Sequence, residues 1–208
     1  MRPAPARIPQ PGGAKEKNRL LFFLLAMVPV FIWSAFRPFD YLIWAADLLF
    51  PVTLVMALLL TRKKFRFSLT TYFVVLIHLI VFLIGAHYRF DQVPFFSVLL
   101  ESGKQKDLFD WFSHFISGVT LAVLVREIFS RAIRFPSRFF LAITVVSVTV
   151  CLGVFWEFSE WAAAVITGDS FNMLGNHPWD TQWDLLMTLA GALISLWLRL
   201  KPPGKNKS

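Results

Sequence analysis

Six long apolar stretches dominate this amino-acid sequence, and each is long enough to cross a membrane as a helix. A helix rises about 1.5 Å per residue, so about 20 apolar residues cover a hydrocarbon core roughly 30 Å thick. The stretches are unbroken apolar runs, unlike the alternating pattern of an outer-membrane barrel. We therefore expect an all-α, polytopic membrane helix bundle with six transmembrane helices. The six stretches are 20–36, 41–60, 69–86, 110–129, 139–166 and 180–198.

Lysine and arginine are distributed unequally between the two ends of these stretches. Seventeen of the 21 precede the first stretch, follow the second, surround the end of the fourth or follow the sixth. Basic residues stay in the cytoplasm, so both chain termini are predicted to be cytoplasmic. The basic residues behind the net charge of +8 then set the topology and contact anionic lipid headgroups. Nucleic acid is not an expected partner. We expect a basic, flexible N-terminus over 1–19, the membrane domain over 20–198 and a basic tail over 199–208.

Ionisable residues inside the membrane are costly, and here most of them gather in the outer third of the bilayer. The fourth, fifth and sixth stretches each contribute one pair of such residues. The members of each pair are three or four positions apart, so they share one face of their helix. We therefore predict an outward-opening pocket with five carboxylates and one imidazole. The three pairs are Asp110 with His114, Glu157 with Glu160, and Asp180 with Asp184.

Small residues follow two of these pairs and would let the helices approach closely. Gly118 and Ala122 follow His114, and Gly191 and Ser195 follow Asp184. Weaker candidates for the pocket are Asp47, His87 and His177, whereas His78 and the Arg126–Glu127 pair are interpreted as packing and interfacial residues.

Five acids at close range need neutralisation, and the sequence leaves three interpretations open. A divalent metal ion (Zn, Mn, Mg or Ca) could bind to the oxygen ligands and the single nitrogen. Alternatively, no cofactor binds, and some carboxylates are protonated and donate hydrogen bonds. Finally, Asp110 and Asp180 lie at helix starts, where an acid is favourable without any function. On the first interpretation the metal ligands are His114, Glu157, Glu160, Asp180 and Asp184.

Seven of the eight tryptophans lie near the outer ends of the stretches. An interfacial belt is the ordinary explanation, but a belt is expected at both faces of a membrane. Tryptophan also offers a flat face to a sugar ring or to a headgroup cation. The candidate ligand-binding residues are Trp111, Trp161, Trp179 and Trp183, together with Glu160 and Asp180.

The same motifs resemble the YjdF-type family of bacterial inner-membrane proteins, whose function is unknown. The resemblance rests on Asp110-Trp-Phe-x-His114-Phe-x-x-Gly118, Glu157-x-x-Glu160-Trp161 and Trp179-Asp-Thr-Gln-Trp-Asp184. It implies a multi-pass protein of the bacterial inner membrane. Members usually carry Gly-Thr-Gln-Gly-Asp before the last motif, but residues 174–178 here read Leu-Gly-Asn-His-Pro. If that missing aspartate is a ligand in the family, His177 is the residue that could replace it.

The motifs also resemble, more distantly, those of the VanZ-like family, which is associated with glycopeptide resistance at the cell surface. That family has Gln where this chain has Glu160 and Asn where it has Thr188. The resemblance implies a non-catalytic accessory protein for the envelope or for antibiotic tolerance, but a shared fold does not transfer a function.

Three functions follow from these patterns. In the first, the pocket binds or acts on an envelope lipid or glycan headgroup. As an enzyme it would be a metal-dependent membrane hydrolase, with Glu157 beside an activated water and His114 as ligand or proton donor. The second is the non-catalytic accessory role. The third, a small transporter, has less support because the inner halves of the stretches are mostly apolar and no inverted repeat is present.

Overall fold

The computed structural model describes residues 13–62, 65–94, 96, 108–168 and 178–198, with side chains from residue 21 onward. These residues form helices and turns and no strand, which confirms the all-α class. The predicted N-terminus, the basic tail and His177 lie wholly or largely outside the described residues. The elements are α1 (Gly13–Ala35), α2 (Tyr41–Asp47), α3 (Leu49–Thr61), α4 (Leu69–Tyr88), the short 3-10 helix η1 (Phe90–Gln92), α6 (Leu108–Ala132), α7 (Arg138–Thr167) and α8 (Asp180–Trp197).

Local hydrogen bonds fix several helix ends. The Asp40 carboxylate accepts from the backbone N–H groups of residues 42 and 43 at 2.7 and 3.0 Å, and so starts α2. Ser68 and Ser137 cap the starts of α4 and α7 in the same way. Such caps satisfy backbone donors that the first helical turn leaves free. Gly168 ends α7 in the left-handed region with φ of 64°, where glycine is favoured.

The α2 and α3 helices form one apolar segment, Tyr41–Thr61, that is interrupted near its start. The interruption falls at Leu48, between the two helices. Pro51 is its cause, because proline has no N–H to donate to the carbonyl of Asp47 one turn earlier. An acidic residue therefore lies at a break in an otherwise apolar membrane segment.

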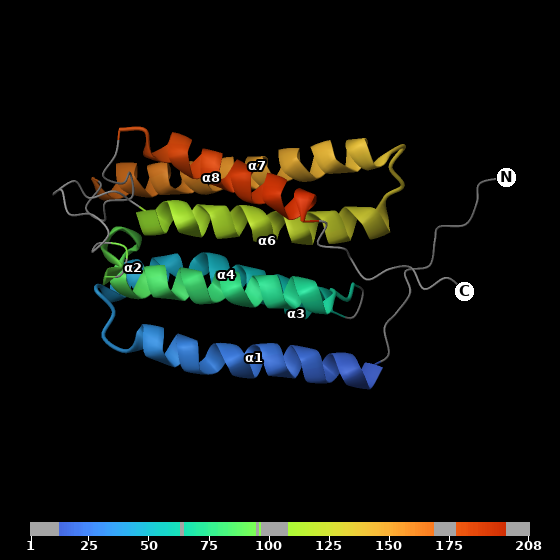
Figure 1. Cartoon of the computed structure of the whole chain (residues 1–208). Coiled ribbons are helices and arrows are strands. Elements are labelled where there is room, and N and C mark those ends of the chain that lie inside the picture. Colours follow the sequence, from blue (N-terminus) through green and yellow to red (C-terminus); the bar gives the residue numbers. More distant parts are fainter. Residues whose placement is uncertain (1–12, 63–64, 95, 97–107, 169–177, 199–208) are drawn as a thin grey trace.

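Four helical segments are long and apolar enough to cross a membrane: Tyr41–Thr61, Leu69–Tyr88, Leu108–Ala132 and Arg138–Thr167. The apolar part of α1, Leu21–Ala35, is shorter. Helix α8 has 18 residues, or about 27 Å at the helical rise, and carries two acids. Both run alongside the longer helices (Figure 1). The structure thus provides four clear spans, and the count of six stays a prediction.

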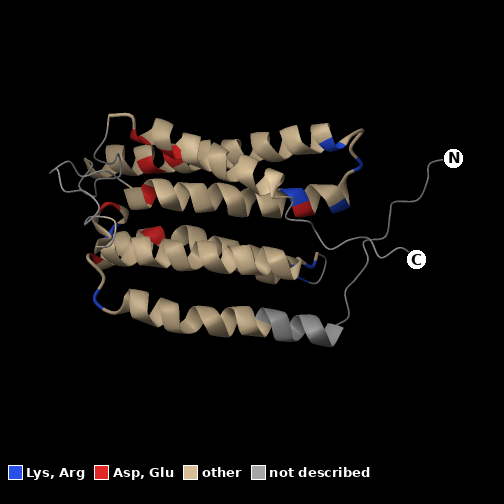
Figure 2. Ribbon diagram, in the orientation of Figure 1, with Lys and Arg blue, Asp and Glu red and all other residues tan. Residues whose placement is uncertain are grey.

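When α2 and α3 are taken as one segment, successive helices are joined at alternating ends of the bundle (Figure 1). Helix α6 is central and contacts α4, α7 and α8, while α1 packs on α4. We call the end where α6 and α8 begin and α7 ends the acidic end, since most Asp and Glu residues of the described helices lie near it (Figure 2). The central position of α6 gives the residues of its first turns neighbours from several helices.

The opposite end of the bundle is closed around Glu127 of α6, which is 2% exposed. Its carboxylate accepts hydrogen bonds from the backbone N–H and the hydroxyl of Ser68 at 2.8 and 3.0 Å, and from the Thr71 hydroxyl. Arg131, one turn later on α6, forms an ion pair with it. This buried acid is fully paired and joins the start of α4 to α6. At the acidic end, by contrast, one carboxylate oxygen each of Glu157 and Asp184 is buried without a hydrogen-bond partner among the described residues.

Candidate functional site

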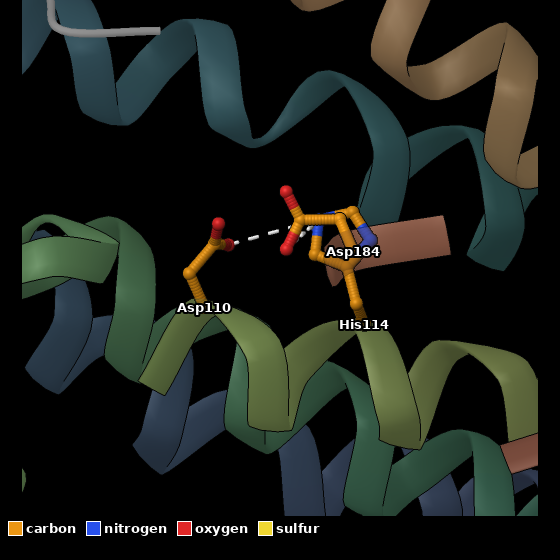
Figure 3. A group of neighbouring side chains, drawn as sticks. All are labelled: Asp110, His114 and Asp184. Carbon is orange, nitrogen blue, oxygen red and sulfur yellow. Dashed lines mark ion pairs between the residues drawn. The ribbon is translucent and has the colours of Figure 1, made fainter. Parts of the chain in front are cut away.

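His114 lies at the centre of the candidate site, in the second turn of α6. Its Nε2 atom is 3.7 Å from Asp110 Oδ1, 3.7 Å from Glu157 Oε1 and 4.0 Å from Asp184 Oδ1. Figure 3 shows the Asp110 and Asp184 carboxylates turned toward the imidazole from two different helices. Residues up to 74 positions apart therefore meet at one point, as the shared depth of the three motifs predicts.

Two groups of possible metal ligands share this histidine. Asp110, His114 and Asp184 form one, and His114, Glu157 and Glu160 form the other, each with ligand atoms within 4.8 Å of one another. Ligands that bind one ion at about 2.0 to 2.6 Å are separated by about 3 to 5 Å, so the spacing within each group fits ligands of one ion. Asp180 belongs to neither group, although it lines the same cavity.

The three central residues are almost completely buried, with exposures of 5% for His114, 8% for Glu157 and 1% for Asp184. Among the described residues, Glu157 Oε1 and Asp184 Oδ1 have no hydrogen-bond partner. Both atoms face His114 Nε2 at distances too long for a hydrogen bond. Burying a carboxylate oxygen without a partner is costly, so these two atoms call for a cation or a proton.

Two glycines allow the close approach of α6 and α8 that assembles the site. A Cβ atom on Gly118 would collide with the backbone carbonyl oxygen of Thr188, and one on Gly191 with that of Phe115. The Thr188 hydroxyl donates to the His114 carbonyl at 3.4 Å across the same contact. Asp184 lies one helical turn before Thr188 on α8. Because the two backbones nearly touch at Thr188, the Asp184 side chain reaches His114. The predicted role is confirmed for Gly118 and Gly191, and for Ala122 and Ser195 it stays a prediction.

A cavity of about 330 Å³ adjoins the histidine. Its polar wall includes Asp110, His114, Glu160 and Asp180. The opposite wall contains charged residues that sequence reasoning ranked low or missed. These are Asp47 at the end of α2, and Arg89 with Asp91 after α4.

Arg89 and Asp91 pair with each other at the cavity wall. Both the Nε and the Nη2 atoms of Arg89 lie 3.1 Å from the carboxylate oxygens of Asp91. The guanidinium also covers the Phe39 ring at 5.2 Å. The two residues are only two positions apart, and Arg89 has a φ of 66°. The ion pair therefore depends on a turn, which a helical spacing pattern does not predict.

The predicted tryptophans occupy the acidic end but do not line the cavity. Trp111 and Trp183 pack on each other with ring centroids 5.2 Å apart, while Trp161 and Trp179 are exposed on the bundle surface. The tryptophan in the cavity wall is Trp156. It directly precedes Glu157, which is the one sequence signal that could have singled it out. Ligand binding by the other four stays a prediction.

The remaining histidines have different environments. His78 is fully buried and its Nε2 atom lies 3.0 Å from the Ser117 hydroxyl, which lines the cavity. That hydroxyl donates to the Ser113 carbonyl at 2.8 Å, so the imidazole must be the donor in the first bond. His87 Nδ1 lies 3.0 Å from the Ser34 carbonyl, at the α1 side of the bundle.

Comparison with known proteins places the chain among bacterial membrane proteins. A family model described as "Predicted membrane protein (DUF2238)" matches residues 19–201. The chain is 28% identical over 176 residues to a protein of Escherichia coli strain K12, "Inner membrane protein YjdF". The alignment covers 83% of this chain and 84% of that relative. No solved structure matches.

Proposed function

The chain belongs to the DUF2238 family of membrane proteins, and from that premise we propose an inner-membrane protein whose acidic end binds a divalent cation and acts on an envelope lipid or glycan headgroup. The match to the Escherichia coli protein confirms the YjdF-type resemblance of the motifs. One observation carries the metal proposal: two buried carboxylate oxygens without hydrogen-bond partners face one buried imidazole nitrogen.

The orientation of the site follows from the basic residues. We propose that α1 and α8 also cross the membrane, which gives six spans with both termini in the cytoplasm. The connections 62–68 and 132–138 then lie inside with most lysines and arginines, and the acidic end faces outward. An outward site meets lipid headgroups and glycans of the envelope rather than cytoplasmic substrates.

Cysteine labelling in intact cells tests this orientation. In a Cys151→Ala background, which removes the sole native cysteine, an impermeant maleimide should label Phe39→Cys at the acidic end. It should label Ile133→Cys, at the other end, only after the membrane is permeabilised. Both native side chains are exposed, so access is limited by the membrane alone. Labelling of Ile133→Cys in intact cells would reverse the topology and place the site inside.

A bound divalent cation would neutralise the acids and supply an activated water or an electrophile for a headgroup oxygen. Four carboxylates and one imidazole are suitable ligands: Asp110, Glu157, Glu160 and Asp184 with His114 Nε2. Glu157 reaches the histidine from α7 with one unpaired oxygen, so it would either hold the ion or, with the ion on the other ligands, accept a proton from water. This arrangement is typical of hydrolysis, which makes a metal-dependent hydrolase the reaction class we propose.

Elemental analysis of the detergent-purified protein tests the metal site. Wild type should retain a stoichiometric divalent ion through gel filtration, and His114→Ala should lose it. His87→Ala is the matched control, because His87 bonds to a backbone carbonyl and is absent from the cavity wall. Metal-free wild type that binds no added Zn, Mn, Mg or Ca would favour protonated carboxylates and refute the metal proposal.

A further inference from the structure

Asp47 is a buried acid without a partner, on the wall of the cavity opposite α7. It is 8% exposed, lines the cavity, and has no hydrogen bond or ion pair with any described residue. It also belongs to neither group of possible metal ligands. An ionisable residue in an apolar membrane segment is expensive, so it is retained for a partner or a task. No described residue supplies that partner, so a ligand bound in the cavity can.

The charged residues that line the cavity indicate that the partner of Asp47 is positively charged. Among the described residues, Arg89 is the one arginine in the cavity wall, and it is already paired with Asp91 through two contacts. The acids that line the cavity or lie beside His114 carry more negative charge than one bound divalent ion would neutralise. A second positive charge therefore complements Asp47. A compact ammonium group with three donors fits a single carboxylate.

Part of the cavity lining is apolar and continues onto the surface of α7. Leu152 and Phe155 line the cavity, yet they are 41% and 71% exposed on the bundle surface. In a membrane that surface faces hydrocarbon. Phe50 of α3 packs against Trp156 of α7 with ring centroids 5.5 Å apart, so aromatic side chains from both helices border the same space. Leu152 and Phe155 give a hydrocarbon chain an apolar path from the cavity to the surface of α7.

We propose that the cavity binds an aminophospholipid: the protonated amine of its headgroup contacts Asp47, and one acyl chain leaves sideways between α3 and α7. This inference rests on the proposed function, because it names the ligand class for the same cavity. The spacing of the α2–α3 segment supports it. Ile43, Asp47 and Phe50 follow each other at four and three residues and all line the cavity, so the acid is flanked by apolar side chains on one face.

Native mass spectrometry with defined lipids tests the headgroup contact. The probes are phosphatidylethanolamine, its N-acetyl derivative, which lacks the positive charge, and phosphatidylglycerol. Wild type should bind phosphatidylethanolamine about tenfold more tightly than either of the others, which corresponds to about 1.4 kcal/mol. Asp47→Asn should lose that preference. Asp40→Asn is the matched control, since asparagine is an equally good helix cap and Asp40 is absent from the cavity wall.

Equal binding of the three lipids by wild type would overturn the inference, and so would an unchanged preference in Asp47→Asn. The melting temperature separates recognition from a structural role. Removing an unpaired buried carboxylate should leave the stability unchanged or raise it. A large fall in the melting temperature of Asp47→Asn together with lost preference would make Asp47 a structural residue, and the inference would fail.

A second pair of variants tests the path of the acyl chain. Leu152→Trp fills the apolar part of the cavity and should weaken phosphatidylethanolamine binding about tenfold or more. Ile143→Trp places the same large side chain on an exposed position of α7 that does not line the cavity, and it should bind as wild type does. Equal lipid binding by the two variants would show that the acyl chain does not lie between α3 and α7.

The metal content of the same samples separates this inference from the proposed function. Protein that keeps its metal but shows no amine preference overturns the aminophospholipid assignment alone. Metal-free protein that keeps both the preference and its dependence on Asp47 supports the assignment and refutes the metal proposal.

Discussion

Replacing His114 by glutamine, Glu157 by glutamine or Asp184 by asparagine is expected to abolish divalent-metal binding without reducing the amount of protein in the membrane. Each change keeps most of the side-chain volume and removes a charge or a coordinating nitrogen. The unpaired oxygens of Glu157 and Asp184 make no hydrogen bond that an amide would break. Losing the bound ion also removes its contribution to stability, about 2.7 kcal/mol at one hundred times Kd.

The measurement is membrane abundance beside bound metal and melting temperature, with and without chelator. Chelator should lower the melting temperature of wild type and have little effect on the three variants. Asp40→Asn, an acid-to-amide change at the same end of the bundle, should behave as wild type. If abundance instead falls in all three variants, these residues form a structural network, since a half-satisfied buried network destabilises a fold. The functional interpretation would then fail.

The central site was predictable because two sequence features agree: the spacing of the ionisable pairs and the distribution of basic residues. A spacing of three or four residues places each pair on one helix face, and the distribution of basic residues predicts that all three pairs lie at one end of the bundle. The contacts of His114 with Asp110, Glu157 and Asp184 follow from those two constraints. The glycines of α6 and α8 were predictable for the same reason, since they repeat on the faces that carry His114 and Asp184.

The other wall of the cavity was not predictable in this way. Asp47 stands alone in its segment, and only the packing of the bundle shows that it faces the site across a cavity. The pairing of Arg89 with Asp91 depends on a left-handed residue in a turn. Trp156 was one of seven similar tryptophans, and its rotation about α7 decides that it faces inward. Glu127 likewise receives its partners from Ser68 and Thr71, more than 50 residues away.

The close contact between α6 and α8 yields the second large effect. Gly118→Ala is expected to destabilise the protein by about 3 kcal/mol and to lower its metal affinity. The added methyl group would collide with the backbone carbonyl of Thr188, which cannot rotate away as a side chain would. The helices must then separate, so the bond from Thr188 to the His114 carbonyl stretches and Asp184 moves away from the imidazole.

Gly153→Ala is the matched control, because it adds the same methyl group next to the same threonine. There the new Cβ would lie 3.2 Å from a side-chain methyl of Thr188, which can shift by a few tenths of an ångström. Alanine is also favoured over glycine inside a helix by about 1 kcal/mol, so this variant should be neutral or slightly stabilised. Thermal melting and metal content should therefore separate the two variants. Equal melting temperatures would show that α6 and α8 can accommodate the added methyl group at this contact. The position of Asp184 would then not depend on the close fit of the two backbones.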